Sequence, residues 1–144
     1  MVDLRVAGGE LIGTEILAGE VPACIDEIPV LAVAMSRAHG PSRVCGAGEL
    51  RVKEADRITG VVTGLRALGA GIDEHEDGFS VDGDATLVGA QLNGLGDHRL
   101  VMAFTIAAAM AEGTSDIASA DAVAISYPDF AHTLNRLGVQ ISGV

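Results

Sequence analysis

The sequence predicts an α/β (α+β) fold in which about two repeated units of short strands and helices pack their helices beneath sheets. Three observations indicate this class. Apolar segments with helical spacing alternate along the chain with short strand-like segments. Nineteen glycines supply turns between these segments. Apolar residues fill 49% of the 144 positions and aromatic residues only 3%, so Ala, Val, Leu and Ile must build the core.

The first half of the chain is expected to form strands around two helices. Gly40 and Pro41 end the first helix, Gly69 ends the second, and Asp77-Gly78 suits the turn of a hairpin. The expected elements are strands at Val2–Val6 and Leu11–Leu17, a helix at Ile28–Ala38, strands at Arg43–Cys45 and Glu49–Lys53, a helix at about Asp56–Leu68, and a hairpin of Ile72–His75 and Phe79–Val81.

The second half is expected to repeat this pattern. Asp97 opens its first helix as Asp26 precedes the earlier one, and Gly113 ends it as Gly40 ends the earlier one. The offset of about 70 residues is that of a βαβαβ-type unit, so residues 11–82 and 86–144 form an internal repeat within one body. The expected elements are strands at Thr86–Val88, Asp116–Ala118 and Val139–Ser142 and helices at Leu100–Ala111 and Pro128–Leu137.

Composition also limits the classes of partner. The net charge of −11 argues against nucleic acids and anionic membranes, because their partners need a basic stripe. The apolar run Leu100–Ala111 is too short to cross a bilayer. Cys24 and Cys45 have neither metal-ligand spacing nor a disulfide-rich context, and no signal peptide is visible. We therefore expect a soluble, cytoplasmic protein with reduced cysteines.

The segment Glu49–Ile58 concentrates the positive charge. Lys53 is the only lysine, and Arg51, Lys53 and Arg57 are three of the nine basic residues. They lie near a strand end and the first turn of a helix, where free backbone N–H groups and the helix dipole favour an anion. The sequence therefore predicts an anion site with a proton-transferring pair beside it.

Lys53 and Glu54 are the candidates for proton transfer. A lysine beside a carboxylate in a partly desolvated site can exchange protons with a substrate. The same two residues also suit a surface ion pair that caps a helix. Arg57, one helical turn beyond Lys53, has the fork geometry to bind a carboxylate or phosphate, or to pair with Asp56 or Glu54.

The helix near Leu100 carries further candidates at its start. Arg99 precedes mostly apolar positions, and a cation at a helix N-terminus opposes the dipole unless an anion lies there. His98 suits a polar helix start as well as a catalytic role, and Asp26 suits an N-cap. The sequence has no metal-ligand spacing and no glycine-rich phosphate loop, so we expect no metal and no cofactor. Any chemistry would then be acid–base and electrostatic.

Four motifs follow one another along the chain, at Ile25–Pro29, Arg51–Arg57, Asp97–Met102 and Tyr127–Phe130. Their order and spacing resemble those of the EPSP synthase (3-phosphoshikimate 1-carboxyvinyltransferase) family. The related UDP-GlcNAc enolpyruvyl transferases share the fold but lack the Lys-Glu-x-Asp-Arg run. The resemblance implies repeated βαβαββ units of the enolpyruvyl transferase fold, with helix N-termini facing a cleft.

The resemblance also implies a reaction and a role for each candidate. In this family the 5-hydroxyl of shikimate 3-phosphate attacks C2 of phosphoenolpyruvate, and phosphate leaves from a tetrahedral ketal phosphate. By position, Asp26 would lie near the attacking hydroxyl, while Lys53 and Glu54 would transfer protons at the methylene and the bridging oxygen. The implied substrate-binding residues are Arg57, His98 and Arg99.

The chain also departs from the family pattern. Ile125 stands where many members carry a lysine, which leaves the response to glyphosate open. The match covers about the last third of the family. We therefore expect 1–144 to be a single partial domain, the C-terminal part of a lobe, inactive without the missing N-terminal portion. Uncovered lobe surface predicts self-association. The alternatives are a non-catalytic anion-binding or assembly module and a UDP-GlcNAc enolpyruvyl transferase-like fragment.

Overall fold

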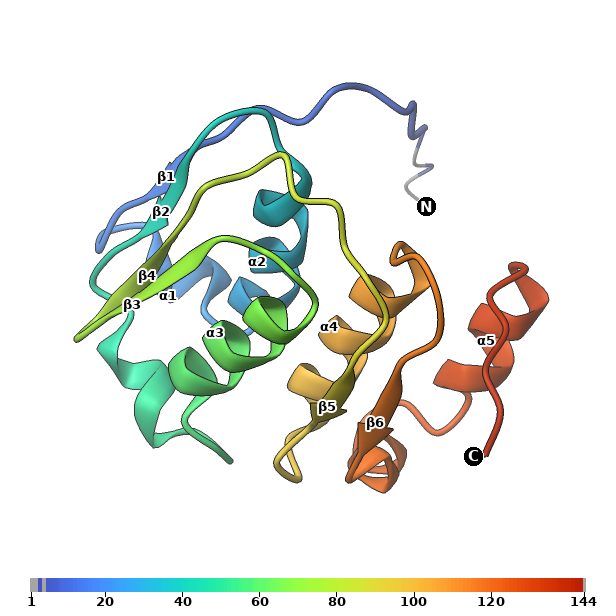
Figure 1. Cartoon of the computed structure of the whole chain (residues 1–144). Helices are drawn as coiled ribbons and strands as arrows, with labels where there is room; N and C mark the ends of the chain where they lie inside the picture. Colours follow the sequence, from blue (N-terminus) through green and yellow to red (C-terminus); the bar gives the residue numbers. More distant parts are fainter. Residues whose placement is uncertain (1–2, 4, 144) are drawn as a thin grey trace.

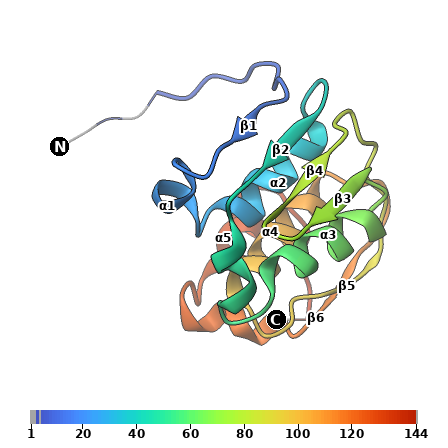
Figure 2. The same ribbon diagram turned by 90° about the vertical axis from the view of Figure 1, so that its left-hand side faces the viewer.

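Two sheets flank a group of helices in the structure, a computed structural model that describes residue 3 and residues 5–143 (Figure 1). The first sheet has the strand order β1-β2-β4-β3 and faces the viewer in Figure 2. Its strands are β1 (Glu15–Ile16), β2 (Ser42–Val44), β3 (Ile72–His75) and β4 (Gly78–Val81). β1 and β2 are parallel, and β4 is antiparallel to both β2 and β3. Gly78 lets β4 approach β2 closely, because a Cβ there would collide with the backbone oxygen of Val44.

Three helices lie behind this sheet in Figure 2. They are α2 (Ile28–Arg37), α3 (Arg57–Ala67) and α4 (His98–Ala109). The side chain of Asp56 accepts a hydrogen bond of 3.0 Å from the Thr59 N–H group and so caps α3. Asp97 caps α4 in the same way, and Pro29 lies in the first turn of α2, where its missing N–H group costs nothing.

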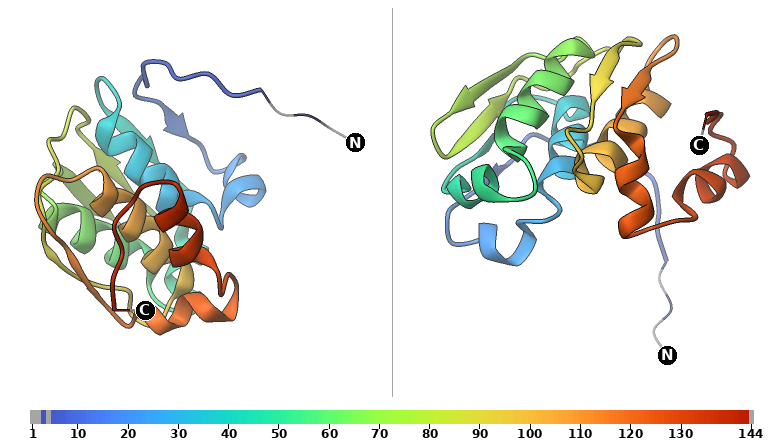
Figure 3. Two further views of the ribbon diagram at one scale, coloured as in Figure 1. Left: turned by 90° about the vertical axis from the view of Figure 1, so that its right-hand side faces the viewer. Right: turned by 90° about the horizontal axis from the view of Figure 1, so that it is seen from below.

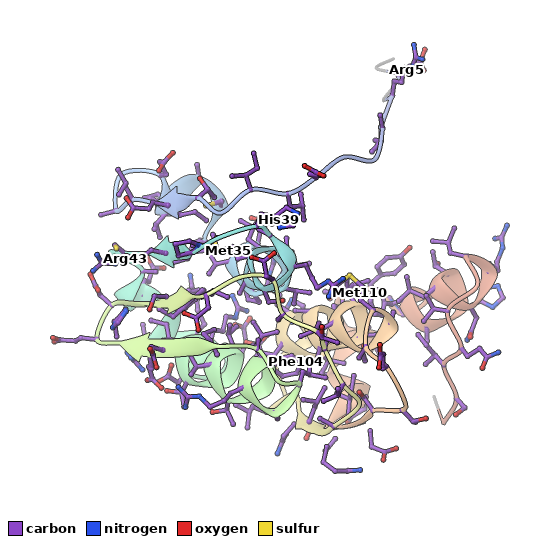
Figure 4. The ribbon with its side chains drawn as sticks, turned by 45° about the horizontal axis from the view of Figure 1, so that its top comes forward. Arg5, Met35, His39, Arg43, Phe104 and Met110 are labelled. Atoms are coloured by element: carbon purple, nitrogen blue, oxygen red, sulfur yellow. The ribbon has the colours of Figure 1, made fainter. Side chains whose placement is uncertain are left out.

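The packing of α3 on α4 depends on two small residues. Gly60 and Gly64 lie one turn apart on α3, and a Cβ at either position would collide with Leu100 or Phe104 of α4. Figure 4 shows Phe104 where these two helices meet. Because both large side chains are fully buried against the glycines, the axes of α3 and α4 come close together. This contact brings the starts of the two helices near each other.

The second sheet consists of two parallel strands, β5 (Gln91–Asn93) and β6 (Asp116–Ala118), which α4 connects. An isolated parallel bridge precedes each parallel strand pair, between Ile12 and His39 in the first half and between Val88 and Glu112 in the second. Each half of the chain therefore contains a parallel β-helix-β connection with similar pairing. The internal repeat over 11–82 and 86–144 stays a prediction.

Four further elements complete the chain: α1 (Val21–Cys24), the 3-10 helices η1 (Gly48–Val52) and η2 (Ala120–Ile125), and α5 (Phe130–Arg136). None of the residues of α5 is buried, and Figure 3 shows this helix beside the rest of the molecule rather than within it. Near the other end of the chain, Arg5 lies far from the body in Figure 4. In the described part of the chain, no helix combines the length and the apolar character needed to span a membrane.

The α/β fold class is confirmed, as are the helices near Ile28, Arg57 and His98, the hairpin of β3 and β4, and the strand Asp116–Ala118. The expected helix Pro128–Leu137 is present as the shorter α5. Of the strand expected over Leu11–Leu17, only β1 forms. The strand expected over Val2–Val6 falls in part on residues 2 and 4, outside the described residues, and residues 3, 5 and 6 belong to no strand.

Three expected strands are wrong. Glu49–Lys53 is largely the 3-10 helix η1, because Arg51 donates hydrogen bonds of 2.7 Å to the backbone oxygens of His75 and Glu76 and so curls the segment toward the hairpin. Thr86–Val88 contains only an isolated bridge, and the ladder begins later, at β5. Val139–Ser142 forms no strand, because the amide of Asn135 binds the Ile141 N–H and C=O groups and holds the segment against α5.

Candidate active site

Helices α2, α3 and α4 all begin at the same end of the molecule, the lower end in Figure 1. Asp26 lies two residues before α2, Arg57 is the first residue of α3, and Asp97 is the N-cap of α4. Salt bridges of 2.9 Å and 2.7 Å join Arg57 to Asp26 and to Asp97. Arg57 therefore connects the starts of all three helices.

Arg57 lies at the centre of this cluster and is only 1% exposed. Its Nε donates to Oδ2 of Asp97 at 2.7 Å, its Nη1 to Oδ1 of Asp26 at 2.9 Å, and its Nη2 to Oε2 of Glu54 at 2.6 Å. Burial works to lower the pKa of Arg57, but its hydrogen bond to Asp97 and the charges of Asp97 and Glu54 outweigh that effect and raise the pKa. The guanidinium stays charged, and three carboxylates compensate its burial.

Asp97 holds this cluster together from the inside. Its side chain is fully buried, and besides Arg57 it accepts hydrogen bonds of 2.9 Å from the Arg99 N–H group and 3.4 Å from the Leu100 N–H group. One carboxylate thus caps α4 and anchors Arg57. The sequence identified Asp97 only as the residue that opens a helix. A helix cap followed by two ionisable residues was the signal in the sequence that pointed to Asp97. The burial of Asp97 against Arg57 was not visible in the sequence.

Arg99 forms the more accessible cationic part of the cluster, with 30% of its side chain exposed. Its Nη2 lies 3.2 Å from Oδ2 of Asp26, and its Nη1 donates to the Asp26 backbone oxygen at 3.0 Å. Asp26 is therefore held between two arginines. Burial works to raise the pKa of Asp26, but the hydrogen bond from Arg57 and the charges of Arg99, Arg57 and Lys53 lower it below its ordinary value. Asp26 is a carboxylate at neutral pH.

The candidate proton-transfer residues Lys53 and Glu54 have different partners. Nζ of Lys53 lies 2.7 Å from Oε1 of Glu49, whereas Glu54 binds Arg57. The alternative of a surface ion pair between Lys53 and Glu54 is therefore wrong, whereas the alternative pairing of Arg57 with Glu54 is confirmed. The proton-transfer role of Lys53 and Glu54 stays a prediction. Asp56 pairs with Arg51 instead of Arg57.

Two other expectations for the helix starts can be compared with the geometry. Asp26 does not cap α2, whose N-cap is Glu27 and has no side-chain cap hydrogen bond. His98 is the first residue of α4 and makes no side-chain hydrogen bond to any of the described residues. The structure thus joins Glu54, Arg57, Asp26 and Arg99 in a chain of salt bridges, whereas the His98 side chain has no hydrogen-bond or salt-bridge partner in the described part of the chain.

A hollow of about 220 Å³ opens next to Asp26 and Arg99. Its walls come from α2, α4 and α5 and are otherwise apolar. The residues that line it are Asp26, Pro29, Val30, Arg99, Met102, Ala103, Ile106 and Phe130. The apolar wall keeps water away from one side of the Asp26–Arg99 pair, and this strengthens electrostatic contacts where the pair borders the hollow. Within the described residues, no group of three His, Cys, Asp or Glu side chains is arranged to hold a metal ion.

The fold is shared with solved structures of enolpyruvyl transferases. The chain superposes on an EPSP synthase from Acinetobacter baumannii with a TM-score of 0.87 at 34% identity, covering 92% of this chain and 32% of that chain. The enolpyruvyl transferase NikO from Streptomyces tendae gives a TM-score of 0.73 at 24% identity over 92% of this chain and 29% of that chain, a likeness of fold alone.

The family can be named more narrowly from the sequence. The EPSP synthase (3-phosphoshikimate 1-carboxyvinyltransferase) family model matches residues 2–134. The chain belongs to this family. Proteins described as 3-phosphoshikimate 1-carboxyvinyltransferase from Acaryochloris marina and from Synechococcus sp. (strain CC9605) are 44% and 46% identical to it over 95% and 94% of its length. The expected resemblance is confirmed.

The matched region is short relative to these proteins. The chain spans 31% of the length of the relatives from Acaryochloris marina and Synechococcus. It spans 32% of the Acinetobacter baumannii structure. The larger part of such a protein therefore lies outside the matched region.

Proposed function

We propose that this chain supplies the phosphoenolpyruvate side of the active site of an EPSP synthase. Such an enzyme transfers the enolpyruvyl group of phosphoenolpyruvate to the 5-hydroxyl of shikimate 3-phosphate in aromatic amino-acid biosynthesis, the shikimate pathway. The proposal rests on one observation: two arginines and two partly exposed carboxylates meet where three helices begin. Family membership supplies the class of reaction.

The reaction needs one proton acceptor at the attacking hydroxyl and proton transfer at two substrate atoms. The 5-hydroxyl oxygen bonds to C2 of phosphoenolpyruvate while C3 takes up a proton, which gives the tetrahedral ketal phosphate. Phosphate then leaves C2 and C3 loses a proton, which restores the double bond. Asp26 accepts the hydroxyl proton, because its carboxylate is ionised at neutral pH. Lys53 and Glu54 transfer the protons at C3 and at the bridging oxygen.

The cations at the helix starts bind the ligand. Arg99 is 30% exposed at the mouth of the hollow and can bind a carboxylate or phosphate through its guanidinium. Arg57 binds from deeper in the site, and His98 lies at the start of the same helix as Arg99. The N-termini of three helices add favourable backbone dipoles for an anion. Positioning and electrostatic stabilisation would then carry the catalysis, without a protein nucleophile or a metal.

The chain alone is expected to be inactive. Binding of shikimate 3-phosphate and exclusion of water require surfaces that oppose these helix starts, and the chain spans only 31% of the length of its relatives. We expect the missing N-terminal portion of the enzyme to provide them. Self-association through uncovered lobe surface and a cytoplasmic location stay predictions.

One observation favours a second function, a non-catalytic anion-binding or assembly module. Arg57, Arg99 and Lys53 each already have a carboxylate partner, so the free chain presents a site whose cations are largely neutralised. Such a site suits weak binding of anions without turnover. The binding preference distinguishes the two functions. A site of the enzyme should prefer phosphoenolpyruvate over inorganic phosphate, and shikimate 3-phosphate should increase this preference once the rest of the enzyme is supplied.

Calorimetric titration of phosphoenolpyruvate tests the proposed site directly. Wild type is compared with Arg99→Ala and with a control, Arg43→Ala, which removes an exposed cation on β2 (Figure 4). We expect weak millimolar binding that Arg99→Ala removes and Arg43→Ala preserves, since only Arg99 lies at the helix starts. Equal loss in both variants would mean that general charge, and not this site, attracts the ligand. Absence of binding to wild type at about 10 mM ligand, above the millimolar Kd of a weak complex, would reject a preformed site.

A further inference from the structure

The cations at the helix starts are already occupied by the protein's own carboxylates. Arg57 binds Asp97, Asp26 and Glu54, and Arg99 binds Asp26. Around these two cations the carboxylates outnumber the guanidinium groups, so an additional anion would enter a site of net negative charge. Arg57 is only 1% exposed and each of its three nitrogens already binds a carboxylate, so an anion gains room at Arg57 when one of these carboxylates moves away.

The three carboxylates on Arg57 differ in how firmly they are held. The side chain of Asp97 is fully buried and also caps α4, so its removal would disturb the fold. Asp26 is held by two arginines, at 2.9 Å from Arg57 and 3.2 Å from Arg99. Glu54 has Arg57 as its only salt-bridge partner among the described residues, and 52% of its side chain is exposed. Glu54 is therefore the carboxylate that can leave at least cost.

The backbone at Glu54 also allows this movement. Glu54 lies in the short connection between η1, which ends at Val52, and α3, which begins at Arg57. When its carboxylate leaves Nη2 of Arg57 it enters water, so it does not become an unpaired buried charge. The donor that it vacates has faced a side chain that is 52% exposed, whereas the Nε of Arg57 faces the buried Asp97. An incoming carboxylate or phosphate oxygen can accept from the vacated donor.

We propose that Glu54 competes with the ligand for Arg57. In the free chain the Glu54 carboxylate occupies Nη2 of Arg57. When the ligand binds, its carboxylate or phosphate group displaces the Glu54 carboxylate from this donor. This inference rests on the proposed function, which assigns the cluster to an anionic substrate. It deepens that function by linking two roles of one residue. Glu54 becomes free to act on the ligand only when a ligand has taken its place on Arg57.

The proposal predicts that neutralising Glu54 tightens anion binding. We would titrate wild type and Glu54→Gln with phosphoenolpyruvate and, separately, with inorganic phosphate. A charge-assisted hydrogen bond to Arg57 competes with the ligand in wild type, so Glu54→Gln should lower the Kd for both ligands about tenfold. A substrate contact made directly by Glu54 would have the opposite effect, because its loss would raise the Kd.

Two variants with the same change of charge serve as controls. Glu76→Gln removes a charge on the turn between β3 and β4, where the Glu76 side chain makes no salt bridge to any described residue. Glu49→Gln removes the partner of Lys53. Glu76→Gln should leave the Kd within about twofold of wild type, because an exposed charge at a distance is screened by salt. Glu49→Gln should lower the Kd less than Glu54→Gln does, because Glu49 binds Lys53 and not Arg57. Unchanged thermal unfolding of each variant verifies that the fold is kept.

The outcomes separate this inference from the proposed function. A tenfold gain in Glu54→Gln alone confirms the displacement, even if phosphoenolpyruvate is bound no better than phosphate, a result that would count against the proposed function. An unchanged or raised Kd in Glu54→Gln overturns the displacement, even if phosphoenolpyruvate is clearly preferred. An equal gain in Glu49→Gln also overturns it, since the competing carboxylate would then act on Lys53.

Discussion

Replacement of Asp97 by Asn should destabilise the protein far more than its small change in shape suggests. The carboxylate makes bonds of 2.7 Å and 3.4 Å to Arg57, and both side chains are at most 1% exposed. Removing one partner of a buried ion pair costs about 3–5 kcal/mol. Asp26 and Glu54 still compensate Arg57, so we expect the lower end, about 3 kcal/mol. For a chain of this size that corresponds to a fall of roughly 9 °C in Tm.

Urea unfolding followed by circular dichroism measures this loss. Asp56→Asn is the matched control, because Asp56 also caps a helix and also binds an arginine, but 38% of its side chain is exposed. Asn caps a helix about as well as Asp, so the cap contributes little to either difference. The control should lose less than about 1 kcal/mol. If Asp97→Asn and Asp56→Asn cost the same, the buried Arg57–Asp97 pair does not hold the helix starts together.

Three further predictions concern packing, acid stability and the C-terminal segment. Gly64→Ala should lower the free energy of unfolding in urea by about 1–3 kcal/mol, because its Cβ would collide with the ring of Phe104. The control Gly48→Ala should lower it by less than about 1 kcal/mol, because a Cβ there meets only a side-chain atom at 3.8 Å. Equal costs would contradict the close α3–α4 contact. Burial works to raise the pKa of Asp26, but Arg57 and Arg99 lower the pKa overall, so ionised Asp26 stabilises the fold fully above the unfolded pKa of 3.8, and this stabilisation is lost as the pH falls through the lower folded pKa. Thermal unfolding between about pH 5 and 2 should therefore depend less steeply on pH in Asp26→Asn than in wild type. An unchanged slope would refute the stabilisation of Asp26 by the two arginines. Asn135→Ala should speed hydrogen exchange at the Ile141 amide, because that amide loses its 2.9 Å acceptor, and exchange in α3 should stay unchanged. Protection that persists at Ile141 would show that another contact holds the segment after α5.

Local signals in the sequence located most of the helices and the hairpin. Asp56 and Asp97 cap α3 and α4 through contacts two or three residues along the chain, so their helix starts could be predicted within a residue or two. Contacts between distant segments decided the errors. The segment at η1 alternates like a strand, but the bonds from Arg51 to the hairpin, 24 and 25 residues away, fold it into a 3-10 turn.

The sequence predicted part of the cluster and one of its pairings, Arg57 with Glu54, but not the burial of the cluster. Helix-start position and residue type pointed to Asp26, Glu54, Arg57 and Arg99, and these four do meet. The sequence contains no measure of burial, so it could not distinguish an exposed cation from Arg57, which is enclosed by three carboxylates. For the same reason Asp97 was missed, because its partner Arg57 is 40 residues away in the chain.

A chimaera tests the central claim most directly. In the EPSP synthase from Acinetobacter baumannii, the region that superposes on this chain, about 32% of its length, would be replaced by this chain. Release of phosphate from phosphoenolpyruvate would then be measured with and without shikimate 3-phosphate. The account predicts release that depends on shikimate 3-phosphate and that Glu54→Ala abolishes. A folded chimaera that binds shikimate 3-phosphate but releases no phosphate would contradict the claim that these helix starts form the phosphoenolpyruvate side of the site.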